Sequence, residues 1–139
     1  MNQKQAQSVF KIFNPGKDFP AISISGTQCK LDCAHCGGKY LKQMLAIDSP
    51  DSLLALCEDL DARGADGALI SSGCDFDGHT MLDEYIDTLA MVKSRTNLIL
   101  NVHTGLITSE LANQLAKTNV DIASVDVVGD FETIKNVYG

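Results

Sequence analysis

The chain has 139 residues, of which 45% are hydrophobic, 21% charged and 6% aromatic, as is typical of one folded domain. It carries 11 basic and 18 acidic residues and a formal net charge of −7, which argues against binding to the phosphate backbone of nucleic acids. No run of about 18 apolar residues predicts a membrane-spanning helix, and residues 1–13 lack the apolar core of a secretory signal. We therefore expect a cytoplasmic protein that neither binds nucleic acid nor enters a membrane.

Short β-type segments alternate with amphipathic segments along the chain, after a turn-rich lead-in over residues 1–18. β-branched and apolar patterns predict strands over residues 21–26, 67–73, 97–102 and 120–128. Apolar stripes and capping residues predict helices from Ser49-Pro50 to Gly64, over residues 81–90, around residues 111–116, and from about Phe131 after the capping residue Asp130. This alternation predicts an α/β fold with a parallel sheet and about four βα units, in one core domain over residues 19–139.

The polar residues of this pattern gather at the ends of the predicted strands. Ligand sites of parallel α/β folds lie at the carboxyl ends of their strands, so this edge is the candidate site. The residues found there are Cys29, Cys33, Cys36, His79, His103 and Asp126.

Three of the five cysteines, Cys29, Cys33 and Cys36, fall within eight residues in a C-x3-C-x2-C pattern. In a reducing compartment, clustered thiols are more typical of metal binding or redox chemistry than of disulfides. Three thiolates can hold a [4Fe–4S] cluster and leave one iron open. A zinc ion would need a fourth ligand, for which the candidates are His35, Cys74, His79 and His103. Cys57 lies on the apolar stripe of a predicted helix, which indicates a core residue.

The segment Cys29-Lys30-Leu31-Asp32-Cys33-Ala34-His35-Cys36, after the first predicted strand, resembles the cysteine motif of the radical S-adenosylmethionine (radical SAM) superfamily. Residues 23–44, 69–78 and 101–139 are similar to its biotin synthase-related branch, which includes the two-protein lipoyl synthases. The resemblance implies part of a TIM-like (β/α)6 barrel. It also implies a [4Fe–4S] cluster on the three cysteines, S-adenosylmethionine (SAM) as second cofactor, and a 5′-deoxyadenosyl radical. This radical would abstract hydrogen from a small molecule or cofactor precursor, as in biotin- or lipoyl-type sulfur insertion.

The same resemblance assigns roles to further residues, without naming a catalytic side chain. Ser72 and Gly73 match the glycine-rich end of strand two, whose backbone meets the SAM amino group, although the family often has glycine where Ser72 stands. Ser124 and Asp126 match polar positions near the SAM ribose or the substrate, and both would point to one face of the sheet. His35 stands where the family has an aromatic residue near adenine.

The resemblance also implies partners. Such an enzyme needs an electron donor such as ferredoxin or flavodoxin. Four of the six βα units of the family core are visible, so we expect a fragment, or a chain that a partner chain or a second copy completes, and a poor catalyst by itself. The alternative is a non-enzymatic Fe–S or zinc-binding module within a larger complex. A thiol-redox protein fits less well, because the Cys33-x-x-Cys36 spacing leaves Cys29 unexplained.

Overall fold

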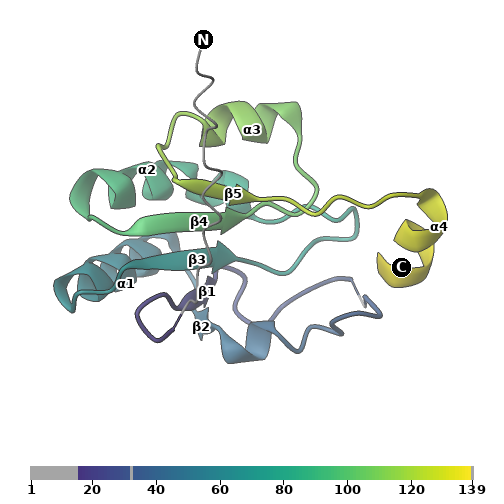
Figure 1. Cartoon of the computed structure of the whole chain (residues 1–139), viewed down its shortest axis with the longest axis horizontal. Helices are drawn as coiled ribbons and strands as arrows, with labels where there is room; N and C mark the ends of the chain where they lie inside the picture. Colours follow the sequence, from purple (N-terminus) through teal and green to yellow (C-terminus); the bar gives the residue numbers. More distant parts are fainter. Residues whose placement is uncertain (1–15, 32, 139) are drawn as a thin grey trace, which may run out of the picture.

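Five parallel strands form one sheet in the computed structural model, which describes residues 16–31 and 33–138 (Figure 1). The strands are β1 (Ala21–Ser23), β2 (Leu45–Ala46), β3 (Gly67–Ser71), β4 (Ile99–His103) and β5 (Ile122–Ser124). Their order in the sheet is β2-β1-β3-β4-β5, and every neighbouring pair is parallel. The predicted α/β class with a parallel sheet is therefore confirmed. Most of the predicted lead-in lies outside the described residues.

β1 and β3 end two to three residues earlier than predicted, and two other strands differ more. Strand β2 was not expected, because two residues are too short to show a strand period; it pairs with β1 through Ile22 and Ser23. The segment predicted as a strand over residues 120–128 is paired only over Ile122–Ser124. Its partner β4 ends at His103, which pairs with Ser124, so the residues that follow have no strand beside them.

The helices follow the strands as expected, but the helix predicted over residues 81–90 begins as a short turn over residues 82–85 and continues as α-helix to Arg95. They are α1 (Pro50–Ala62), α2 (Ile86–Arg95), α3 (Ser109–Leu115) and α4 (Phe131–Thr133), with short turns η1 (Leu41–Gln43), η2 (Leu82–Tyr85) and the π-helical turn η3 (Ile134–Tyr138). The Ser49 hydroxyl accepts the Ser52 amide at 3.2 Å, and the Asp130 carboxylate accepts the Thr133 amide at 2.8 Å, so both predicted caps are confirmed. No helix in the described ranges is long and apolar enough to cross a membrane.

The core lies between the sheet and the helices. Strands contribute Ile22, Ile70 and Leu100, and helices α1 and α2, which lie against each other, contribute Leu53 and Leu89; all five are fully buried. Cys57 is also fully buried in this core, as expected. Figure 1 shows the carboxyl ends of β3, β4 and β5 pointing toward the edge where α4 lies.

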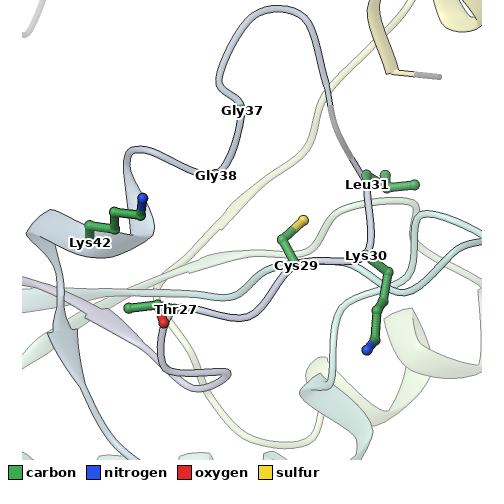
Figure 2. A pocket seen from close by; sticks show the side chains of 7 residues that line it. All are labelled: Thr27, Cys29, Lys30, Leu31, Gly37, Gly38 and Lys42. Carbon is green, nitrogen blue, oxygen red and sulfur yellow. The ribbon is translucent and has the colours of Figure 1, made fainter.

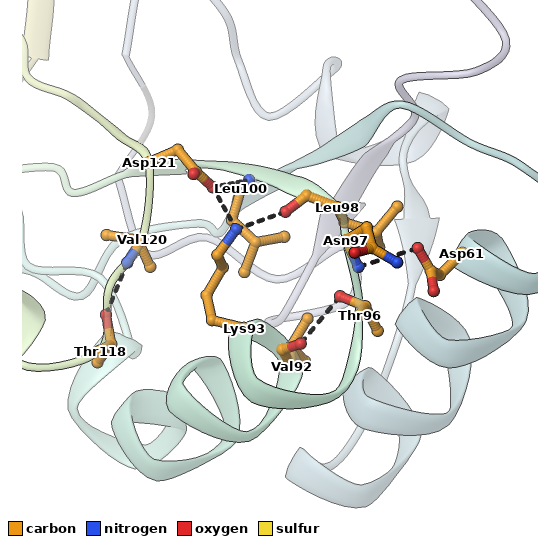
Figure 3. Close-up of polar contacts among 10 residues, drawn as sticks. All are labelled: Asp61, Val92, Lys93, Thr96, Asn97, Leu98, Leu100, Thr118, Val120 and Asp121. Atoms are coloured by element: carbon orange, nitrogen blue, oxygen red, sulfur yellow. Dashed lines mark hydrogen bonds and ion pairs between the residues drawn. The ribbon is translucent and has the colours of Figure 1, made fainter.

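A polar cluster fixes the opposite edge of the sheet (Figure 3). Lys93 of α2 places its Nζ 2.7 Å from the Asp121 carboxylate and donates to the Leu98 carbonyl at 2.7 Å. The same Asp121 oxygen accepts the Leu100 amide at 2.8 Å. One ion pair therefore joins α2 to the amino ends of β4 and β5.

Candidate functional site

The three clustered cysteines lie on the loop after β1, over residues 24–40, which we call the cysteine loop. Backbone hydrogen bonds fasten it to the segment after β3: the Ile24 amide donates to the Ser71 carbonyl at 2.9 Å, and the Lys30 amide donates to the Cys74 carbonyl at 2.7 Å. The loop therefore lies at the carboxyl edge of the sheet, where the alternation of strands and helices predicts a site. Asp32 lies outside the described residues.

The thiols of Cys29 and Cys36 are close enough to Cys33 to affect its ionisation. Cys33 is buried, and the other two are partly exposed. Burial raises the pKa of Cys33, and the charges of Cys36 and Cys29 and a hydrogen bond with Cys36 raise it further. Thiols that disfavour one another's ionisation are stabilised as thiolates by a bound cation.

The donor chemistry suits a thiophilic metal or an iron–sulfur cluster. Besides the three thiols, the Cys74 amide donates to Cys29 Sγ at 3.3 Å, and such bonds to sulfur tune iron–sulfur centres. Within residues 16–31 and 33–138, no three His, Cys, Asp or Glu side chains stand in the arrangement of a preformed metal site.

A cavity of about 330 Å³ lies between the two limbs of the cysteine loop. Figure 2 shows the Cys29 sulfur pointing into the space between these limbs, with Lys42 reaching in from η1. Gly37 and Gly38 have φ angles of 49° and 66°, a region that side chains other than glycine's rarely allow, so they permit the sharp return of the chain. The residues that line the cavity are Thr27, Cys29, Lys30, Leu31, Gly37, Gly38 and Lys42.

Ser72 and Gly73 are placed beside the cysteine loop. The Ser72 hydroxyl donates to the Gly73 carbonyl, and the Gly73 amide donates to the Ser25 hydroxyl at 2.7 Å. A Cβ on Gly73 would stand 2.0 Å from the Gln28 carbonyl oxygen and 2.7 Å from Cys29 Cβ. The glycine therefore lets the segment after β3 approach the cysteine loop closely.

Ser124 and Asp126 form two polar pairs with β4. The Ser124 hydroxyl donates to Asn101 Oδ1 at 2.8 Å, and Asp126 Oδ2 lies 3.4 Å from His103 Nε2. Asn101 and His103 are two residues apart on one strand, so both pairs lie on one face, as expected. The other ring nitrogen of His103 lies 3.4 Å from the hydroxyl of Ser71, a residue whose role was not predicted.

The C-terminal turn η3 packs against the cysteine loop, which the sequence did not indicate. The Ala34 amide donates to the Val137 carbonyl at 2.8 Å, and the Cys33 thiol donates to the Tyr138 carbonyl at 3.7 Å. The ring of His35, a predicted adenine contact, lies 5.1 Å from the Tyr138 ring, centroid to centroid. Burial raises the pKa of Tyr138, as do the nearby charges of Asp126, Cys33 and Cys36.

The structure separates the candidates for a fourth ligand. The Cys74 amide donates to Cys29 Sγ, so this residue adjoins the cluster of three. Burial raises the pKa of the Cys74 thiol to about 11, and the charges of Cys29 and Cys33 raise it further. His79 lies instead beside Asp75, at 3.8 Å, and His103 lies between Ser71 and Asp126.

Fold and site together define an α/β domain with a thiol-rich loop at the carboxyl edge of its parallel sheet. No family model matches this chain, and a search of curated proteins finds no match either. The radical SAM resemblance therefore stays a prediction, which rests on the cysteine motif and on its place after the first strand.

Proposed function

We propose that this chain is a radical SAM protein that holds a [4Fe–4S] cluster on Cys29, Cys33 and Cys36 and binds SAM beside it. The observation that carries this proposal is the C-x3-C-x2-C loop at the carboxyl end of β1, in which Cys29 and Cys36 lie close enough to Cys33 to raise the pKa of its thiol. When bound, these cofactors supply a 5′-deoxyadenosyl radical for hydrogen abstraction from a small molecule or cofactor precursor.

The strand order supports the finer proposal that the sheet is part of a TIM-like (β/α)6 barrel. Strands β1, β3, β4 and β5 are neighbours in chain order. Barrels add each new strand next to the last one, whereas a doubly wound sheet reverses direction at a switch point. The four strands other than β2 fit the order of a growing barrel. The two-residue β2 lies on the other side of β1, so the complete order β2-β1-β3-β4-β5 is also that of a doubly wound sheet.

The residues of the chain have separate tasks in this proposal. The three thiolates hold the cluster, and the Cys74 amide orients Cys29 Sγ through its hydrogen bond. The pairs Ser124–Asn101 and Asp126–His103 offer polar groups to the ribose or the substrate on one face of the edge. Asp126 uses one oxygen for His103, and its side chain is 50% exposed, so it is accessible to a ligand.

A basic face around the cysteine loop supports an acidic electron donor, such as ferredoxin or flavodoxin, as partner. Lys30, Lys39 and Lys42 are exposed and make no ion pair with any other residue that the structure describes. In a chain of net charge −7, this face would attract an acidic protein to the side where an electron must enter.

Metal analysis after anaerobic reconstitution tests the proposal. The full chain is incubated with iron and sulfide, desalted, and analysed for iron, sulfide and zinc. We expect about four irons and four sulfides per chain, lost in Cys29→Ala, Cys33→Ala and Cys36→Ala and kept in the control Cys57→Ala. Stoichiometric zinc without iron would contradict the proposal.

A second candidate function is a non-enzymatic Fe–S or zinc-binding module within a larger complex. The observation that favours it is the position of Cys74 beside Cys29 and Cys33, because four thiolates form the closed set of structural zinc sites. SAM binding separates the two functions: equilibrium dialysis of the loaded chain against labelled SAM should show one bound molecule for the enzyme and none for the module.

A further inference from the structure

We infer that Cys74 is a fourth sulfur donor of the metal centre on the cysteine loop. The inference rests on the proposed function in one respect, namely that the loop binds a metal. It adds a ligand from outside the C-x3-C-x2-C motif, 38 positions after the last cysteine of that motif.

Backbone contacts place Cys74 at the cysteine loop. Its carbonyl accepts the Lys30 amide at 2.7 Å, and its amide donates to Cys29 Sγ at 3.3 Å. These two bonds hold the Cys74 backbone alongside residues 29 and 30. Cys74 is a partly exposed residue outside the core, in contrast to the fully buried Cys57.

The neighbouring glycine makes this placement firm. Gly73 is so close to the loop that a side chain there would collide with the Gln28 carbonyl and with Cys29. The Gly73 amide is also bonded to the Ser25 hydroxyl at 2.7 Å. Cys74 therefore lies three residues beyond the end of β3, in a segment fixed to the cysteine loop, whereas the other three thiols lie on the loop itself. A metal ion that draws the loop thiols together would bind beside Cys74.

The number of sulfur donors decides what the centre can do. Four thiolates close a tetrahedral site, and three leave a position open to another molecule. In the proposed function, Cys74 would occupy the position that SAM needs, so SAM binding would release this thiol, which takes up a proton. The centre would then be protected while no SAM is present.

Anaerobic titration of the full apo chain with Co²⁺ tests this inference, because the sulfur-to-cobalt charge-transfer band grows with each thiolate bound. The variants are Cys74→Ala, Cys29→Ala as a ligand already proposed, and Cys57→Ala as a matched control. Far-UV circular dichroism checks their fold. We expect Cys74→Ala and Cys29→Ala each to lose about a quarter of the wild-type intensity and to bind Co²⁺ at least about tenfold more weakly, and Cys57→Ala to match wild type.

The outcomes separate this inference from the proposed function. If Cys74→Ala matches wild type while Cys29→Ala is weaker, the loop binds metal and Cys74 is not a ligand. If wild type itself gives no thiolate band, the proposed metal centre fails as well.

A second measurement uses wild type alone. Zn²⁺ should protect Cys74 from iodoacetamide as fully as it protects the three loop cysteines, as read by peptide mass spectrometry. Equal alkylation of Cys74 with and without Zn²⁺ would overturn the inference.

Discussion

Gly73 controls the contact between the core sheet and the cysteine loop. We predict that Gly73→Ala lowers the free energy of unfolding by about 2 kcal/mol or more, because its Cβ would overlap backbone atoms of Gln28 and Cys29 that cannot move aside without shifting the loop. Gly129→Ala is the matched control, since no atom lies within 4 Å of a Cβ at that position. Urea unfolding measures both variants; equal midpoints would refute the prediction.

Asp121 gives the stability of the fold a defined dependence on pH. Burial alone would raise the pKa of Asp121, but hydrogen bonds from Lys93 and the Leu100 amide outweigh it and lower the pKa below the ordinary value of 3.8. A carboxylate with a lowered pKa stabilises the folded chain above its unfolded pKa, and this contribution is lost as the pH falls through the folded pKa.

We therefore predict that Asp121→Asn reduces the free energy of unfolding by about 1 kcal/mol at pH 7, a modest value because the group is partly exposed to solvent. The difference from wild type should shrink below about pH 4. Urea unfolding at pH 7 and at pH 3 measures it. A difference that is as large at pH 3 as at pH 7 would show that the charge of Asp121 is not the cause.

At this scale the cysteine motif and the caps at Ser49 and Asp130 could be predicted, because each depends on a few residues within one short segment. The contact of Cys33 with Tyr138 could not, since 105 positions separate the two residues and no local pattern records their meeting. His35 illustrates the consequence: a contact with the adenine of SAM is predicted there, and the ring that His35 meets in this structure is that of Tyr138, near the other end of the chain.

Among the elements, the turn η3 acts as a cover on the cysteine loop. We predict that Tyr138→Ala speeds the alkylation of Cys33 in the apo chain roughly 2- to 12-fold, because the lost ring contact is worth about 0.5–1.5 kcal/mol of local opening. Tyr40→Ala is the control, since that ring is 51% exposed at the far end of the loop. Iodoacetamide labelling followed by peptide mass spectrometry gives the rates. Equal acceleration by both variants would mean that η3 does not cover Cys33.

The helices with a strong apolar period could be predicted from the sequence, whereas the strand bounds that depend on pairing with a neighbouring strand could not. The stripes of α1 and α2 repeat over several turns, so their existence follows from the sequence. The length of β5 depends on where its neighbour β4 ends, and β2 forms because β1 has a free side to pair with. Both features depend on the neighbouring strand and not on the sequence of β5 or β2 itself.

For the whole molecule, the distribution of charge is as informative as the total. Residues 27–43 contain three of the 11 basic residues and one of the 18 acidic ones, so the rest of the chain is strongly acidic. Long-range attraction of this kind is screened by salt.

We predict that Lys30→Glu with Lys42→Glu weakens the binding of an acidic flavodoxin about tenfold at low ionic strength, and that the loss shrinks in high salt. Lys17→Glu with Lys117→Glu is the control, because it makes the same change in net charge at residues before β1 and after α3, away from the cysteine loop. Isothermal titration calorimetry measures the affinities; an equal loss in the control would show that net charge, not this face, governs binding.

The parallel sheet follows from alternation of strands and helices, since parallel neighbours need a crossover between them. The partial barrel stays a prediction from the family resemblance, because closure depends on the tilt and register of all strands together, which single-segment patterns do not encode.

Electron paramagnetic resonance of the reconstituted, dithionite-reduced chain, with and without SAM, tests the central claim most directly. We expect a [4Fe–4S]⁺ signal whose shape changes when SAM is added, because SAM binds to an iron whose fourth position is open or exchangeable. A cluster signal that SAM leaves unchanged, or a chain that holds zinc and gives no such signal, would contradict it.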